Sequence, residues 1–254
     1  MEDGRSGTAV GAIRLKNVAK EHVLANGDRL RVLEDISFEI ANHSFTSILG
    51  PSGCGKSTIL NLIAGLDNHS SGEISIDGSC FGFVFQQPRL LNWRTVTENV
   101  ILPLEQQNFT KDAMRGIAGK YLALVGLTGY ENYYPLQLSG GMQQRVAIAR
   151  ALAIDPEFLL MDEPFSGLDE ITARKLRQEL LRIWQETGKT ILFVTHSMSE
   201  SVFLSQQILI VSPKPARIFQ RVTIDLPYPR EYGDLKLFEI EKQLTRDFLG
   251  MEQG

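Results

Sequence analysis

The stretch "GPSGCGKST", residues 50–58, decides the fold of this 254-residue chain. Gly50, Gly55, Lys56 and Ser57 match the pattern G-x-x-x-x-G-K-[ST], in which backbone N–H groups turn inward around phosphate oxygens. An apolar strand precedes the match and a helix-like segment follows it, so a plain glycine-rich turn is the weaker alternative. The pattern predicts a loop in which Lys56 reaches phosphates and Ser57 holds Mg²⁺.

A second polar pair follows the apolar strand in "FLLMDEP", residues 158–164. Asp162 stands where the strand ends and suits the coordination shell of Mg²⁺. Glu163 comes next and could orient or deprotonate an attacking water. The alternative is a simple turn after a buried strand, which the nearby phosphate loop makes less favoured.

Three strands predict a parallel core sheet. "SFTSILG" (44–50), "FLLMDEP" (158–164) and "TILFVTH" (190–196) are apolar along most of their length, as strands buried on both faces are. Ligands of such sheets bind at the carboxyl edge, where the phosphate loop, Asp162, Glu163 and His196 would collect.

The rest of the chain predicts an antiparallel sheet at its start and helices in its middle. Residues 13–23 and 30–40 alternate in polarity around the hairpin signal "NGD" at 26–28, and "GEISIDG" (72–78) adds another strand. Residues 88–155 are mostly helical in pattern, as are 173–187 and 234–248.

Composition excludes several classes of protein. A net charge of -4 without a basic block argues against a nucleic-acid partner. No apolar run is long enough to span a bilayer, and the start has no signal core, so we expect a cytoplasmic protein with reduced Cys54 and Cys80.

A second glycine-rich helix start occurs in "LSGGMQQR", residues 138–145. Ser139 is a favourable N-cap, and Gly140 and Gly141 leave the helix N-terminus free of bulky side chains. The helix dipole makes this a second candidate anion site. A plain capped helix is the alternative.

Six elements together resemble the ATP-binding subunits of ABC transporters. They are a Walker A loop (50–58), "FVFQQ" with Gln86, the signature "LSGGMQQR", a Walker B strand (158–163), "SGLD" (166–169) and His196. The resemblance implies an α/β P-loop NTPase fold of the ABC type, with a mostly parallel core sheet, an N-terminal antiparallel β subdomain and a helical subdomain. It implies ATP and Mg²⁺ as cofactors. The loop positions expected to bind ATP are Gly50, Pro51, Ser52, Gly53, Cys54, Gly55, Lys56, Ser57 and Thr58.

The predicted organisation has three parts. Residues 1–12 are a flexible N-terminus, 13–225 a single ATPase domain with its helical subdomain at about 88–155, and 226–254 a C-terminal extension with a helix.

The family implies a head-to-tail dimer, formed with a second copy or a homologous subunit. The signature residues Ser139, Gly140, Gly141 and Gln143 would then close on the partner's ATP. This explains why one chain carries two anion cradles.

The remaining roles also follow from the resemblance. Gln86 would join Ser57 and Asp162 at Mg²⁺, and His196 would contact the γ-phosphate and hold Glu163. Asp169 would lie at the dimer interface.

One branch of the family is favoured. "RLLNWRTVTENV" (89–100) and "SPKPARI" (212–218) are similar to segments of nitrate, sulfonate and taurine importers. Trp93 and Arg94 would then receive a cytoplasmic helix of the permease, although a core Trp and a solvated Arg are the alternative. The implied function is an ATPase on the cytoplasmic face of the plasma (inner) membrane. This ATPase would power a permease that receives its cargo from an extracytoplasmic substrate-binding protein.

Two other functions stay open. A soluble ABC ATPase could act as a mechanical or assembly module without transport. A P-loop nucleotide kinase should lack the signature stretch and carry arginines for an acceptor phosphate.

Three departures from the family pattern, and the position of Cys54, lead to predictions. His22 stands where an aromatic residue stacks on adenine. "SCFG" (79–82) is short and predicts a tightened hairpin between the flanking strands. Ser197 replaces the usual Asp and would form a capping box with Glu200. Cys54 lies in an electropositive loop, which predicts a lowered thiol pKa and alkylation that ATP prevents.

Overall fold

The computed structural model describes residues 12–252. The predicted flexible segment therefore lies outside the described residues, apart from Ala12, which is buried. The chain opens with an antiparallel sheet in the order β2-β1-β4, made of β1 (Ile13–Val23), β2 (Arg29–Ile40) and β4 (Ser71–Ile76). β1 and β2 form a hairpin around "NGD", as the sequence predicts.

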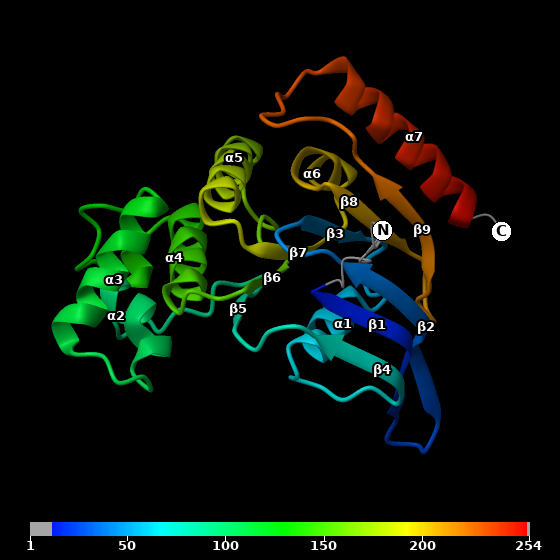
Figure 1. Ribbon diagram of the computed structural model, residues 1–254, viewed down its shortest axis with the longest axis horizontal. Helices are drawn as coiled ribbons and strands as arrows, with labels where there is room; N and C mark the ends of the chain where they lie inside the picture. The colour runs from blue at the N-terminus through cyan, green and yellow to red at the C-terminus, as the bar shows by residue number, and fades with distance from the viewer. Residues whose placement is uncertain (1–11, 253–254) are drawn as a thin grey trace, which may run out of the picture.

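A six-stranded sheet forms the centre of the molecule, in the order β5-β6-β7-β3-β8-β9 (Figure 1). The first five strands in this order, from β5 through β3 to β8, are parallel. The sixth strand, β9, runs antiparallel to β8. Every residue of β3 and β7 is buried, which explains their continuous apolar sequences. The strands are β3 (Phe45–Leu49), β5 (Phe81–Val84), β6 (Phe158–Asp162), β7 (Thr190–Thr195), β8 (Gln207–Val211) and β9 (Ile218–Thr223).

Helices surround this sheet in two groups. One group packs beside the sheet or on its faces: α1 (Lys56–Ile63), α5 (Glu170–Thr187), α6 (Met198–Leu204) and α7 (Leu235–Glu252). The other group forms the helical part at one end of the molecule in Figure 1: α2 (Val96–Ile101), η1 (Leu102–Leu104), α3 (Lys111–Leu124), η2 (Pro135–Gln137) and α4 (Gly140–Ala153). Among the described residues, no helix is long and apolar enough to cross a membrane.

The central sheet separates two hydrophobic cores. In β6, Phe158 and Leu160 face the core shared with α1 and the antiparallel sheet. Leu159 and Met161 face the opposite core, which α4, α5 and α6 complete. This alternation fixes the strand register, because a slip by one residue would exchange the two faces. The carboxyl ends of the strands are thereby held in place.

Two local predictions are wrong. The expected hairpin at 79–82 is absent, because β4 belongs to the antiparallel sheet while β5 pairs in parallel with β6. The short connection instead carries the chain from one sheet to the other. The capping box of Ser197 and Glu200 is only half formed. Ser197 Oγ accepts from the Glu200 N–H, but the Glu200 carboxylate accepts from Thr195 Oγ1.

Candidate functional site

The glycine-rich loop joins β3 to α1 at the carboxyl edge of the central sheet. Gly55 has a φ of 123°, and a Cβ there would lie 2.9 Å from Leu33 Cδ2, so no other residue fits without strain. Lys56 is only 4% exposed, and its Nζ donates to the carbonyls of Gly50 and Pro51, both at 2.9 Å. The lysine therefore lies along the inside of its own loop, with its charge directed where a phosphate would enter.

Cys54 contradicts the prediction of a reactive thiol. Its side chain is 2% exposed, and burial raises the pKa of the thiol despite the nearby charge of Lys56. The thiolate is the nucleophilic form, and a buried thiol in apolar surroundings forms it less readily. The sequence shows the positive charge of the loop but not the packing beneath it.

Ser57 and Asp162 meet at the start of α1 and the end of β6. Ser57 Oγ donates to Asp162 Oδ1 at 3.0 Å. Burial raises the pKa of the Asp162 carboxyl, while the bond from Ser57 acts in the opposite direction. A hydroxyl and a carboxylate side by side, in a place that disfavours uncompensated negative charge, suit a hard divalent cation. The predicted pair is therefore brought together.

Glu163 lies between two candidate catalytic groups. Its Oε2 is 3.0 Å from His196 Nδ1, and its Oε1 is 3.7 Å from Lys56 Nζ. The backbone of Glu163 has a φ of 42°, a left-handed conformation that non-glycine residues seldom adopt. Its N–H donates to Val194 O at 2.9 Å, which ties it to β7 two residues before His196. Such strained residues are characteristic of functional sites.

Gln86 follows β5 and turns toward the same edge of the sheet. Its Nε2 donates to Ser166 Oγ at 3.0 Å, and the Ser166 N–H donates to Glu163 O. The glutamine is therefore linked to the loop of Glu163, rather than bonded directly to Ser57 or Asp162. Its predicted contact with a metal stays a prediction.

The second glycine-rich stretch is a capped helix start, built from its own chain. Ser139 Oγ accepts from the Met142 N–H at 3.3 Å. A Cβ on Gly141 would lie 2.5 Å from Thr172 Cγ2, so the glycine allows α4 to pack against α5. Gln143 Nε2 donates to the carbonyls of Pro135 and Leu138, which braces the turn before the helix.

The two glycine-rich stretches belong to different parts of the molecule. α4 packs mainly on α2 and α3, and also on β5 and α5, whereas α1 packs on β6 and β7. Figure 1 shows α4 at the helical end and α1 between the two sheets.

Asp169 and His22 are both exposed, and their predicted roles at the dimer interface and at adenine stay predictions. Asp169 caps α5 by accepting from the Thr172 N–H at 3.0 Å, and that bond lowers the pKa of its carboxyl. His22 is exposed on β1, opposite Leu30 of β2.

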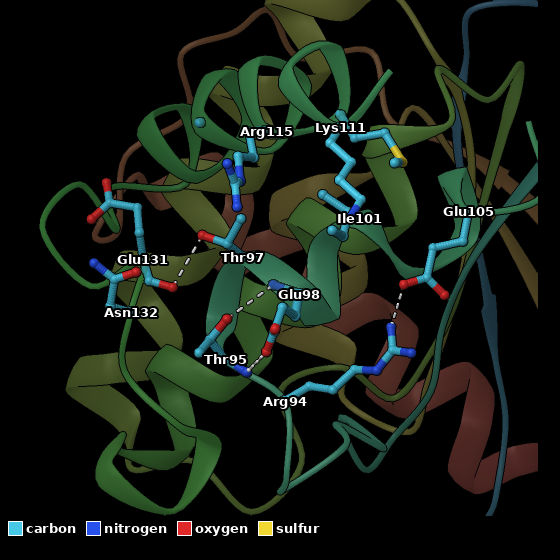
Figure 2. Close-up of a pocket in the computed structure, with 12 residues that line it drawn as sticks. Arg94, Thr95, Thr97, Glu98, Ile101, Glu105, Lys111, Arg115, Glu131 and Asn132 are labelled. Carbon is cyan, nitrogen blue, oxygen red and sulfur yellow. Dashed lines mark hydrogen bonds and ion pairs between the residues drawn. The ribbon is translucent and has the colours of Figure 1, made fainter. Parts of the chain in front are cut away.

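The helical part holds Trp93, Arg94 and a cavity of about 780 Å³ (Figure 2). Trp93 is 75% exposed, which rejects the alternative of a core tryptophan. Arg94 pairs with Glu105 at the edge of the cavity, which α3 lines with Lys111 and Arg115. None of the residues that line this cavity belongs to the phosphate loop or its carboxylates.

The sequence did not predict the hydrogen bonds that support His196 and Gln86. Thr195 Oγ1 accepts from the Ser197 N–H at 3.0 Å and donates to Glu200 at 2.6 Å, on either side of His196. The pattern "TH" gives no sign of this pairing. Ser166 accepts the hydrogen bond from Gln86. It lies within "SGLD", but nothing in that pattern indicates Gln86 as its partner.

Comparison with known proteins agrees with this geometry. The family model described as "ABC transporter" matches residues 33–166. The chain is 44% identical over 227 residues to an aliphatic sulfonates import ATP-binding protein, SsuB, of Bacillus cereus, covering 86% of this chain and 89% of that protein. It is 46% identical over 200 residues to a taurine import ATP-binding protein, TauB, of Yersinia pestis, covering 76% and 78%.

Solved structures of one cassette, MJ0796, are also similar. Its dimeric structure as a bacterial ABC transporter cassette superposes with a TM-score of 0.75 at 35% identity, over 87% of this chain and 100% of that chain. Its dimeric post-hydrolysis state, bound to ADP and Pi, superposes with a TM-score of 0.74 at 34% identity over the same shares.

Proposed function

This chain belongs to the ABC transporter family as an ATP-hydrolysing subunit, and we propose that two such subunits close head to tail around two Mg-ATP to drive an import permease. The observation that carries the proposal is the position of Glu163, which contacts Lys56 and His196 at once. A single carboxylate thus joins the phosphate loop to the end of β7. That arrangement suits hydrolysis of a terminal phosphate.

In the proposed mechanism, the backbone N–H groups of residues 50–58 bind the phosphates of ATP. Lys56 leaves the carbonyls of Gly50 and Pro51 and bonds the β- and γ-phosphates. Glu163 orients the attacking water and takes its proton, so that the new bond forms at the γ-phosphorus while the bond to ADP breaks. His196 holds the Glu163 carboxylate through the 3.0 Å contact and donates to the γ-phosphate.

Ser57 and Asp162 would hold Mg²⁺, since their oxygens already lie 3.0 Å apart. Bound there, the cation would neutralise charge on the transferring phosphate. Gln86 would join this shell by exchanging its bond to Ser166.

A second subunit would complete each site. Ser139, Gly140 and Gly141 form a helix N-terminus, and the side chains nearest to Gly140 and Gly141 are those of Leu168, Thr172 and Leu176 of the same chain. A head-to-tail partner would place this cradle on the ATP of the other subunit. The dimeric structures of MJ0796 support the proposal. Asp169, near the start of α5, would lie at this interface.

The permease would dock on the helical part. Trp93 is exposed, and the segment after it is tied to residues 131–133 by backbone bonds from Val96 and Thr97. Residues 133–136, which continue from that range, add the exposed side chains of Tyr133, Tyr134 and Leu136. An exposed apolar surface of this kind typically contacts another protein. Trp93 and Arg94 would lie within that contact.

The names of the relatives support a small anion as cargo, a sulfonate or taurine, with nitrate as the further member of the predicted branch. An extracytoplasmic binding protein would deliver it to the permease. The ATPase would then be a peripheral protein at the cytoplasmic face of the plasma (inner) membrane.

Glu163→Gln tests the proposal. The amide keeps the size of the side chain but cannot take a proton, so hydrolysis should fall about 10²- to 10⁴-fold. ATP binding should persist and the dimer should accumulate, as measured by equilibrium binding and size-exclusion chromatography with light scattering. The exposed ion-pair variant Glu39→Gln serves as a control and should hydrolyse ATP normally. Undiminished turnover by Glu163→Gln would contradict the mechanism.

A further inference from the structure

The helix that follows His196 is too short to be stable by itself. α6 has only seven residues, Met198–Leu204, and isolated helices below about 12 residues are marginal in water. Its N-cap, Ser197, is the neighbour of His196. His196 therefore lies between the buried strand β7 and a helix whose own position depends on tertiary contacts.

Two side chains from the segment 226–232 satisfy the C-terminal end of α6. Arg230 Nη1 donates to Val202 O at 2.7 Å, to Phe203 O at 3.3 Å and to Ser205 O at 2.8 Å. Tyr228 Oη donates to Leu204 O at 2.7 Å. These bonds satisfy the carbonyls of residues 202–205. Most carbonyls at the C-terminal end of a helix lack a partner within the helix.

Arg230 is buried to an unusual degree for a charged residue, at 5% exposed. Within the described chain its hydrogen bonds all go to backbone carbonyls, and its other nitrogens bond Leu226 O and Ile224 O of its own segment. A buried cation is costly unless its donors are satisfied, and a guanidinium carries five donors in a fixed fork. Its charge also complements the negative end of the α6 dipole.

Further contacts join α6 to the C-terminal segment along its length. The Tyr232 ring stacks on Phe203 at 4.1 Å between centroids. At the start of the helix, Thr245 of α7 donates to Met198 Sδ at 3.1 Å. Glu200 of α6 then accepts from Thr195, the residue before His196. The chain of contacts runs from Arg230 through α6 to His196 and Glu163.

We infer that Arg230 and Tyr228 are positioning residues, which hold α6 so that His196 stays within reach of Glu163. This inference rests on the proposed role of His196 in hydrolysis. It gives the C-terminal segment a function in the ATPase site without contact with the nucleotide.

The test compares Arg230→Met, Arg230→Lys and Tyr228→Phe in the full chain. Single-turnover hydrolysis by Arg230→Met should fall about 10- to 100-fold, because misplacement by about 1 Å has effects of this size. ATP affinity, measured by equilibrium binding, should stay within about twofold, since the phosphate loop is untouched. Arg230→Lys should recover part of the rate, and Tyr228→Phe should lose about twofold to fivefold. Arg221→Met is the control. It removes a similar bond, from Arg221 to Ser37 O at 2.6 Å, and should leave the hydrolysis rate and the ATP affinity unchanged.

A double-mutant cycle with His196→Ala separates positioning from general stability. If Arg230 acts through His196, then Arg230→Met should cause no further loss in the His196→Ala background. An equal further loss would overturn the inference, as would a weaker ATP affinity with an unchanged hydrolysis rate. If His196→Ala alone left hydrolysis unchanged, the proposed role of His196 would fail first and this inference with it. Should Arg230→Met not fold, Tyr228→Phe carries the same cycle.

Discussion

Residues 50–58 and 138–145 are both glycine-rich turns that open a helix, but their surroundings differ. At the first, Lys56 lies against its own loop, Ser57 bonds Asp162, and Glu163 contacts Lys56 and His196. The candidate groups for hydrolysis thus converge on one point. At the second, the hydrogen bonds of Ser139 within the described residues stay in its own helix, and Gln143 braces the preceding turn.

The difference shows that a helix N-terminus is not a complete site. Backbone N–H groups and a helix dipole attract an anion at both places. Only the first place adds a lysine, a candidate metal pair and a candidate base. The second can contribute donors to a nucleotide that another chain holds, which is the physical reason to expect a dimer.

The largest effect should come from Lys56. In Lys56→Met the apolar stem stays and the charge is lost, so hydrolysis should fall about 10²- to 10³-fold, as when a single stabilising donor is removed. ATP affinity should fall as well, because the lysine also binds the ground state. Lys189→Met, which breaks a surface pair with Asp155, is the matched control and should leave both quantities unchanged. Near-normal hydrolysis by Lys56→Met would contradict the role of the first loop.

An intermediate effect should separate capping from nucleotide binding at the second turn. Ser139 and Thr110 cap α4 and α3, which have 14 residues each, and each accepts one backbone N–H. Loss of either cap should cost about 1 kcal/mol of stability, seen as similar shifts of Tm. Only Ser139→Ala should also lower hydrolysis, by about 10-fold or more, because it loses a donor to a charged phosphate. Equal hydrolysis rates in the two variants would count against the signature role.

The smallest effect should be at Cys54. Cys54→Ala should cost about 1 kcal/mol through a small cavity while hydrolysis stays near wild type. Because burial raises the pKa of the thiol, iodoacetamide should label it slowly at neutral pH and faster as the pH rises. Labelling is followed by mass spectrometry in a Cys80→Ala background. Rapid labelling at neutral pH would show that the loop opens far more than its packing suggests.

The sequence predicted those parts of the site that depend on local pattern. The phosphate loop, the strand before Asp162 and the cap at Ser139 all formed as expected, because glycine spacing and apolar runs act over a few residues. It did not predict the burial of Cys54 or the bonds of Arg230, because these depend on which distant segments pack together. A single arginine between "LPYP" and "EYGD" has no periodicity that could reveal its partner.

The most direct test of the two-cradle account mixes two inactive variants. Lys56→Ala disables the first loop, and Ser139→Arg fills the second turn with a long side chain. In a head-to-tail dimer each mixed pair has one site with both parts intact, so a 1:1 mixture should recover up to about a quarter of wild-type ATP hydrolysis. If both turns served the ATP of the same chain, the mixture would stay as inactive as either variant alone.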